Sequence, residues 1–116
     1  LDGGGRVNAT FEFVSTTGPA SGMTLLMLAM MKGHEGLAEA LLQRGADVSL
    51  QSGDGGTALM CAALNGREKV IELALRHGAE IDVQSNAGDT ALMQAVFFGH
   101  PAALRCLLRA GADVTV

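Results

Sequence analysis

Hydrophobic residues recur along the chain at the spacing of amphipathic helices, in three pairs of segments. In the first segment of a pair the apolar residues occupy positions i, i+3 and i+4, which lie on one face of a helix. A threonine precedes this segment and a glycine follows it, as at Thr57 and Gly66. Threonine caps free backbone N–H groups, and glycine adopts the left-handed conformation that ends many helices. The second segment starts near residue 35, 68 or 101 and ends at another glycine, so the pattern predicts three helix pairs.

The predicted buried faces are aliphatic rather than aromatic. The chain contains four Phe and neither Trp nor Tyr, so its core must consist of Leu, Ala, Val and Met. Small side chains at a contact allow two helices to approach closely. In the first helices the expected buried residues include Leu59, Ala62, Ala63, Leu92, Ala95 and Val96; in the second helices they are Leu37, Ala38, Leu41, Leu42, Val70, Ile71, Ala74, Leu75, Ala103, Leu104, Leu107 and Leu108.

The three pairs share one sequence pattern at an interval of 33 residues, which Gly33, Gly66 and Gly99 mark. A fixed period of this length indicates a solenoid of stacked supersecondary units. Between the units the sequence is polar and rich in glycine, with isolated apolar residues at Val48 and Ile81. Such a stretch favours an extended segment that a turn folds back.

The shared pattern G-x-T-x-L-x-x-A-x-x-x-G, followed by L-x-x-G-A, resembles the ankyrin repeat over residues 22–116. This resemblance implies an all-α solenoid of helix-turn-helix units with β-turn or hairpin fingers at one side. The sequence departs from the family's T-P-L-H tetrapeptide, because its second unit reads Thr57-Ala58-Leu59-Met60 and methionine replaces histidine in all three units. Serine, as at Ser52 and Ser85, stands where the family usually has an acidic finger residue.

The repeats form one continuous array along the chain. Residues 1–9 resemble residues 42–50 and are interpreted as the end of a preceding repeat, so the chain is expected to be a fragment of a longer array. Residues 10–21 form an insertion in a finger, and repeats follow at 22–50, 51–83 and 84–116. Phe11 and Phe13 alternate with a polar residue and could extend a hairpin. The insertion either packs as a loop on the first repeat or contacts a partner.

Composition excludes several classes of function. The net charge is −4 and the basic residues are scattered, which argues against nucleic-acid binding. No apolar run is long enough for membrane insertion. Cys61 and Cys106 lack a CxxC spacing and are interpreted as thiols in a reducing, intracellular compartment, either cytoplasm or nucleus.

The sequence predicts neither an enzyme nor a cofactor site. Catalysis needs a nucleophile, a base and an orienting group that converge in a pocket. His34 and His100 occupy equivalent repeat positions and His77 precedes a repeating glycine, so the repeat itself accounts for them. No spacing of cysteines and histidines resembles a zinc site.

The predicted binding residues lie on the concave face and on the fingers. In the resembled family, the two residues before the glycine that follows the first helix of each repeat face the concave side. Met31, Leu64 and Phe97 would therefore form an apolar row. Alternatively, these residues half-bury against neighbouring helices, or Phe98 packs on a further repeat. The full candidate set is Met31, Lys32, Leu64, Asn65, Phe97 and Phe98 on the helices, Gln51, Ser52, Asp54, Gln84, Ser85, Asn86 and Asp89 on the fingers, and Phe11 and Phe13 in the insertion.

The resemblance therefore predicts a non-enzymatic module that binds a protein or peptide along its concave face and fingers, next to flanking repeats of its parent protein. Two alternatives stay open. The chain could be a regulatory or targeting segment of a larger enzyme or channel. It could also be a structural spacer or a self-association element that stacks through its ends.

Overall fold

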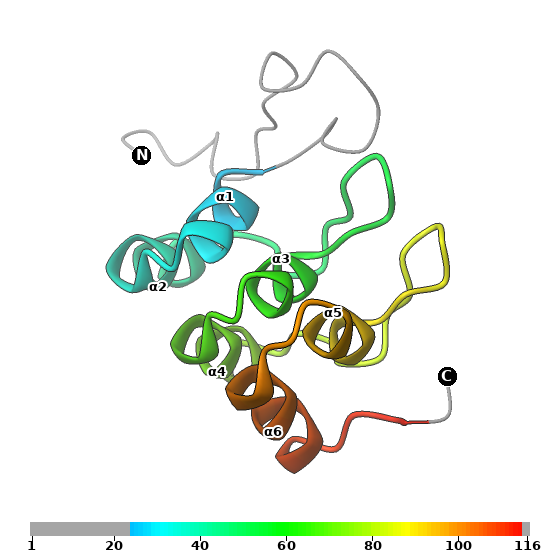
Figure 1. The fold of residues 1–116 in the computed structure, drawn as a ribbon. Coiled ribbons are helices and arrows are strands. Elements are labelled where there is room, and N and C mark those ends of the chain that lie inside the picture. The colour runs from blue at the N-terminus through cyan, green and yellow to red at the C-terminus, as the bar shows by residue number, and fades with distance from the viewer. Residues whose placement is uncertain (1–23, 115–116) are drawn as a thin grey trace.

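The computed structural model describes residues 24–114, which form a row of three helix pairs (Figure 1). The loops between pairs project together at one side, beyond α3 and α5 (Figure 1). The all-α repeat solenoid predicted from the sequence is confirmed. The proposed hairpin around Phe11 and Phe13 lies outside the described residues. The pairs are α1 (Leu25–Lys32) with α2 (Glu35–Gln43), α3 (Ala58–Leu64) with α4 (Glu68–Arg76), and α5 (Ala91–Phe97) with α6 (Pro101–Arg109).

A buried threonine starts the first helix of each pair. The hydroxyl oxygen of Thr24 accepts a hydrogen bond from the backbone N–H of Met27 at 3.1 Å, which satisfies one free donor of the first turn. The backbone N–H of Thr24 in turn points at the Met27 sulfur, 3.5 Å away. The methionine that replaces the family's usual histidine therefore takes part in the cap of α1. Thr57 and Thr90 accept equivalent bonds at 3.3 Å.

Side chains that precede the second helices of the second and third repeats bond each of these repeats to the repeat before. The Arg67 Nε donates to the carbonyl oxygen of Met31 at 3.2 Å. His100 bonds the carbonyl oxygen of Leu64 through Nε2 at 2.9 Å, and because a carbonyl only accepts, this nitrogen carries the proton. Both bonds satisfy carbonyls at the C-terminal end of a helix, where partners within the helix are missing.

The core lies between the two rows of helices and is dense because alanines line the contacts. α1 packs on α3, and α3 packs on α5. Ala62, Ala63 and Ala95 are fully buried at these contacts. The aliphatic core predicted from the sequence is confirmed for most positions, including Leu41 and Ile71.

Three predicted core residues are instead exposed because they lie at the ends of the described stack. Val96 is 60% exposed, whereas Ala63, one repeat earlier, is fully covered by α5. Leu37 is 36% exposed, whereas Val70, one repeat later, is buried. The helical spacing identified an apolar face correctly but did not show whether a neighbouring repeat covers it. The residues for which burial was wrongly predicted are Leu37, Val96 and Leu108.

Neighbouring leucines of α6 give a matched test of this packing. Leu107 is fully buried and Leu108 is 43% exposed. Leu107→Ala should lower the free energy of unfolding by about 2–5 kcal/mol because it leaves a cavity in the core. Leu108→Ala should lower it by about 1 kcal/mol or less, since part of the side chain already contacts water. Chemical denaturation measures both values, and equal losses for the two variants would contradict the described packing.

Candidate partner-binding groove

A groove of about 660 Å³, called the concave groove, runs along the side of the stack from which the fingers project. Two fingers contribute to it, finger A (residues 51–56) and finger B (residues 84–89). Helices α1, α3 and α5 supply the rest of the lining. The lining residues are Met31, Ser52, Gly53, Asp54, Gly56, Met60, Cys61, Leu64, Ser85, Asn86, Ala87, Asp89 and Gln94.

Each finger is closed by its own backbone hydrogen bonds. In finger A the N–H of Ser52 donates to the carbonyl of Gly56, and the N–H of Gly55 donates to the carbonyl of Ser52, both at 2.8 Å. Finger B repeats the arrangement between Ser85 and Asp89, at 2.8 Å. The predicted tight turns are therefore present in both described fingers.

The two fingers are also bonded to each other. The backbone N–H of Asn86 donates to the carbonyl of Asp54 at 2.8 Å, and its side-chain amide donates to the carbonyl of Gly53 at 3.0 Å. Gly55 permits this approach, because it adopts a φ of 83° and a Cβ there would lie 2.7 Å from the Asn86 nitrogen. The fingers therefore present their polar groups as one connected surface.

The groove combines an apolar helical lining with polar finger groups. Met31, Met60 and Leu64 supply the apolar part. Asp54 and Asp89 are the charged side chains among the described residues that line it, so the groove has a negative character. The Asp54 carboxylate also accepts a hydrogen bond from the Gly56 N–H at 3.0 Å, which fixes its orientation. This arrangement suits an apolar side chain next to polar or cationic groups.

The thiol of Cys61 is the nucleophilic group in the groove lining, and its surroundings suppress the thiolate. Burial, with the negative charge of Asp54 as a smaller contribution, raises the pKa of this thiol to about 11. A thiolate is the reactive form of cysteine, so the raised pKa makes Cys61 a poor nucleophile near neutral pH. Cys61 therefore lines the groove as a neutral thiol near neutral pH.

Seven of the residues proposed from the sequence gather at this groove. Met31 and Leu64 come from neighbouring first helices, and the other five come from the two fingers. Two of the three residues of the predicted apolar row thus share one groove with polar finger residues. The seven are Met31, Ser52, Asp54, Leu64, Ser85, Asn86 and Asp89.

Other proposed residues do not line the groove. The side-chain amides of Gln51 and Gln84 donate to carbonyls within their own fingers, at Gly55 (2.8 Å) and Gly88 (3.1 Å). Asn65 donates to the carbonyl of Cys61 at 3.0 Å. These three side chains therefore stabilise the local backbone. Lys32 is exposed at the end of α1 and is not part of the groove lining.

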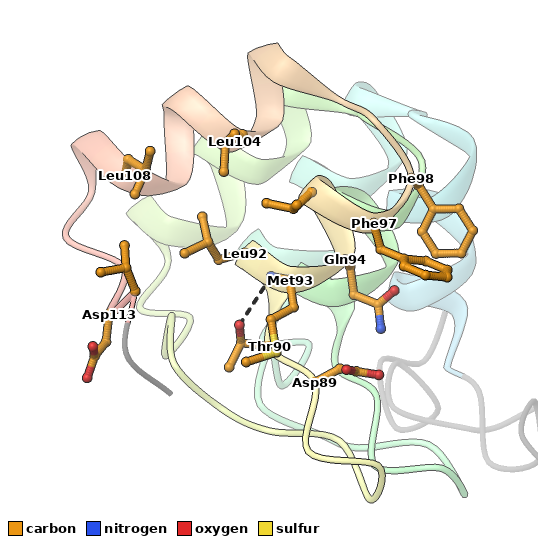
Figure 2. Close-up of a pocket in the computed structure, with 12 residues that line it drawn as sticks. Asp89, Thr90, Leu92, Met93, Gln94, Phe97, Phe98, Leu104, Leu108 and Asp113 are labelled. Carbon is orange, nitrogen blue, oxygen red and sulfur yellow. Dashed lines mark hydrogen bonds between the residues drawn. The ribbon is translucent and has the colours of Figure 1, made fainter.

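Phe97 and Phe98 are among the residues that line a second groove, of about 690 Å³, to which α5 and α6 contribute (Figure 2). Their rings meet edge to face, with centroids 5.0 Å apart. Figure 2 shows Leu104 and Leu108 directed from α6 toward Leu92 of α5. Phe97 therefore lines a different groove from Met31 and Leu64, with which it shares a repeat register, and Asp89 and Gln94 line both grooves.

Sequence reasoning missed several residues of the concave groove. Met60 was interpreted only as the methionine that replaces histidine in the tetrapeptide, and Cys61 only as a thiol of a reducing compartment. Gln94 received no role, although it stands one repeat after Cys61 and lines the same groove. The repeat register was the signal for Cys61 and Gln94. These residues stand three positions before Leu64 and Phe97, so they face the same side of neighbouring helices.

Residues 24–114 contain neither a cluster of metal-binding side chains nor a membrane-spanning helix. No three side chains of the types that bind metal ions gather in this range. None of the helices described is long and apolar enough to cross a membrane.

Comparison with known families agrees with the repeat geometry. A family model of ankyrin repeats matches residues 26–116 in three copies. This chain belongs to the ankyrin repeat family. Ankyrin repeats generally serve as protein–protein interaction modules and are typically non-catalytic. A search of curated proteins found no match.

Because the pKa of Cys61 is raised, we predict slow alkylation of this thiol in the concave groove. At pH 8 the thiolate fraction should be on the order of one in a thousand. In a Cys106→Ser background, the rate of reaction with iodoacetamide should rise about tenfold per pH unit up to pH ~10. The chain unfolded in urea should react much faster at pH 8, because its thiol regains the ordinary pKa. A folded-state rate that levels off near pH 9 would contradict the description of this site.

Proposed function

We propose that this chain is a binding module that holds a segment of a protein partner in the concave groove. The observation that carries the proposal is the joining of finger A and finger B by the two hydrogen bonds of Asn86. A surface fixed before binding loses little conformational freedom when a partner docks. Polar groups at fixed positions next to an apolar lining favour selective recognition of one partner segment.

The lining indicates the chemistry of that segment. Met31 and Met60 have flexible, polarizable thioether side chains that adapt to the shape of an apolar side chain. Asp54 and Asp89 favour an amide, hydroxyl or cationic group beside it. We infer that the partner inserts one apolar side chain between the methionines and places polar or positively charged groups against the fingers. An intracellular location stays a prediction from the cysteine pattern.

A matched pair of leucine substitutions tests this proposal. Leu64→Ser removes apolar lining from the groove, whereas Leu37→Ser makes the same chemical change on α2, outside the groove. A partner is first captured with the wild-type chain and then purified. We expect Leu64→Ser to raise the Kd for that partner at least tenfold, because truncation of a central apolar contact weakens an interface by about 1–2 kcal/mol or more. Leu37→Ser should change the Kd less than twofold.

Two controls make the result decisive. Circular dichroism and the unfolding midpoint must first establish that both variants are folded. The purified partner should also slow the alkylation of Cys61 at pH 10, because this thiol lines the groove. Equal affinity of the two variants, or unchanged alkylation in the complex, would contradict binding at this groove.

A further inference from the structure

Two aromatic rings at the C-terminal end of α5 are exposed to solvent. Phe97 is 81% exposed and Phe98 is 49% exposed. Their rings meet edge to face, with centroids 5.0 Å apart and planes at 85°. This contact holds the ring of Phe97 in one orientation, and the large exposed fraction means that it does not cover both faces of that ring.

The exposure of Phe97 does not depend on its place in the last described repeat. Leu64 and Met31 are the equivalent residues of the two earlier repeats, and both stay partly exposed although a further helix pair follows each of them. Val96 differs, because the equivalent Ala63 is fully buried by the following helix pair. Phe97 therefore belongs to a register that stays accessible along the array, whereas Val96 does not.

Gln94 and Asp89 connect the aromatic pair with the concave groove, because both residues line the two grooves. Gln94 stands three positions before Phe97, so their side chains are neighbours on α5. Figure 2 shows both side chains directed away from that of Leu92. Asp89 comes from finger B and is partly buried. A continuous part of the surface therefore carries an aromatic ring, an amide and a carboxylate.

This combination of groups suits the side chain of an arginine. A guanidinium stacks on an aromatic face and donates several N–H groups from its plane. The amide oxygen of Gln94 and the carboxylate of Asp89 are acceptors for such groups. Among the described residues, no Lys, Arg or His lines either groove. A partner's arginine therefore complements the negative character that Asp54 and Asp89 give to the concave groove.

We propose that Phe97, Gln94 and Asp89 bind an arginine of the partner segment that occupies the concave groove. The guanidinium stacks on the face of the Phe97 ring next to Gln94, and Phe98 positions that ring. This inference rests on the proposed function, because the same segment inserts its apolar side chain between the methionines of the concave groove. It adds a second anchor of defined chemistry to that segment.

The spacing of the helices predicts the spacing of the two anchors. Packed helices lie about 8–10 Å apart, so a side chain held between α1 and α3 lies roughly 12–15 Å from Phe97 on α5. An extended chain rises about 3.3 Å per residue, and its residues i and i+4 point to the same side. The apolar residue and the arginine should therefore stand about four positions apart in an extended segment.

Selection from a library of random peptides displayed on phage tests the proposal without a known partner. The wild-type chain should enrich peptides that carry an arginine about four positions from a large apolar residue. Phe97→Leu keeps an apolar side chain but removes the aromatic face. Selection on this variant should therefore retain the apolar residue and lose the arginine. The unfolding midpoint of Phe97→Leu should stay within about 2 °C of the wild type, because Phe97 is largely exposed.

Leu64→Ser separates a failure of this inference from a failure of the proposed function. Peptides enriched on the wild type should bind Leu64→Ser at least about tenfold more weakly. Enrichment of the apolar residue without an arginine at the stated spacing would overturn the arginine site alone. Peptides that bind Leu64→Ser as tightly as the wild type, or a selection that enriches no peptide, would overturn the proposed function and this inference together.

Exchanges within one enriched peptide measure the contact itself. Citrulline in place of the arginine removes the charge and keeps the shape, so it should raise the Kd for the wild-type chain about tenfold in calorimetric titrations. The same exchange should raise the Kd for Phe97→Leu by about threefold or less, because the aromatic face is gone. Equal effects of citrulline on the two chains would overturn the site, and equal binding of a lysine peptide would overturn its assignment to a guanidinium.

A matched pair of charge substitutions tests the contribution of the carboxylate. Asp89→Asn should raise the Kd for the arginine peptide about threefold or more and leave that for the citrulline peptide nearly unchanged. Glu39→Gln removes the same charge from an exposed position on α2 and should have little effect on either peptide. Equal effects of Asp89→Asn and Glu39→Gln would contradict a role of Asp89 in the site.

Discussion

The close contact between successive first helices is the constraint on which the other features depend. Ala62 and Ala95 are fully buried at these contacts, and a larger side chain at either position would have to push two helices apart. Because α3 and α5 pack directly on each other, the fingers that precede these two helices emerge side by side. The spacing of the fingers is thus a consequence of helix packing.

The spacing of the two fingers allows the concave groove to form. Finger B lies near enough to finger A for Asn86 to bond the carbonyls of Gly53 and Asp54, and Gly55 leaves the space that this contact needs. The same stacking brings Met31 and Leu64 to one concave surface. It also leaves the face of α5 and α6 with its apolar residues uncovered among the residues described. The two grooves are neighbours on one short array, because Asp89 and Gln94 line both of them.

Much of the fold could be predicted because its determinants are local and repeated. The capping threonines, the glycines that end the helices and the 33-residue period identified all six helices and their approximate ends. Burial at the ends of the stack could not be predicted in this way. Val96 and Ala63 occupy the same helical position, and only the presence of a following repeat makes one buried and the other exposed.

The candidate groove was partly predictable for a similar reason. Repeat register placed Met31 with Leu64, and turn chemistry identified the fingers. Register could not show that the side chain of Gln51 bonds its own finger instead of facing a partner. It also could not show that Phe97 lines the groove along α5 and α6, because register does not show how the side chains of these two helices lie in space.

Methionine methyl resonances test the central claim most directly. Met31 and Met60 line the concave groove, Met93 lines the α5–α6 groove, and Met27 and Met30 are buried in the core. Spectra of the [¹³C-methyl]methionine-labelled chain are recorded with and without the purified protein partner. We predict that the Met31 and Met60 signals shift on binding while that of Met93 stays in place. A shift of Met93 alone would contradict recognition by the concave groove.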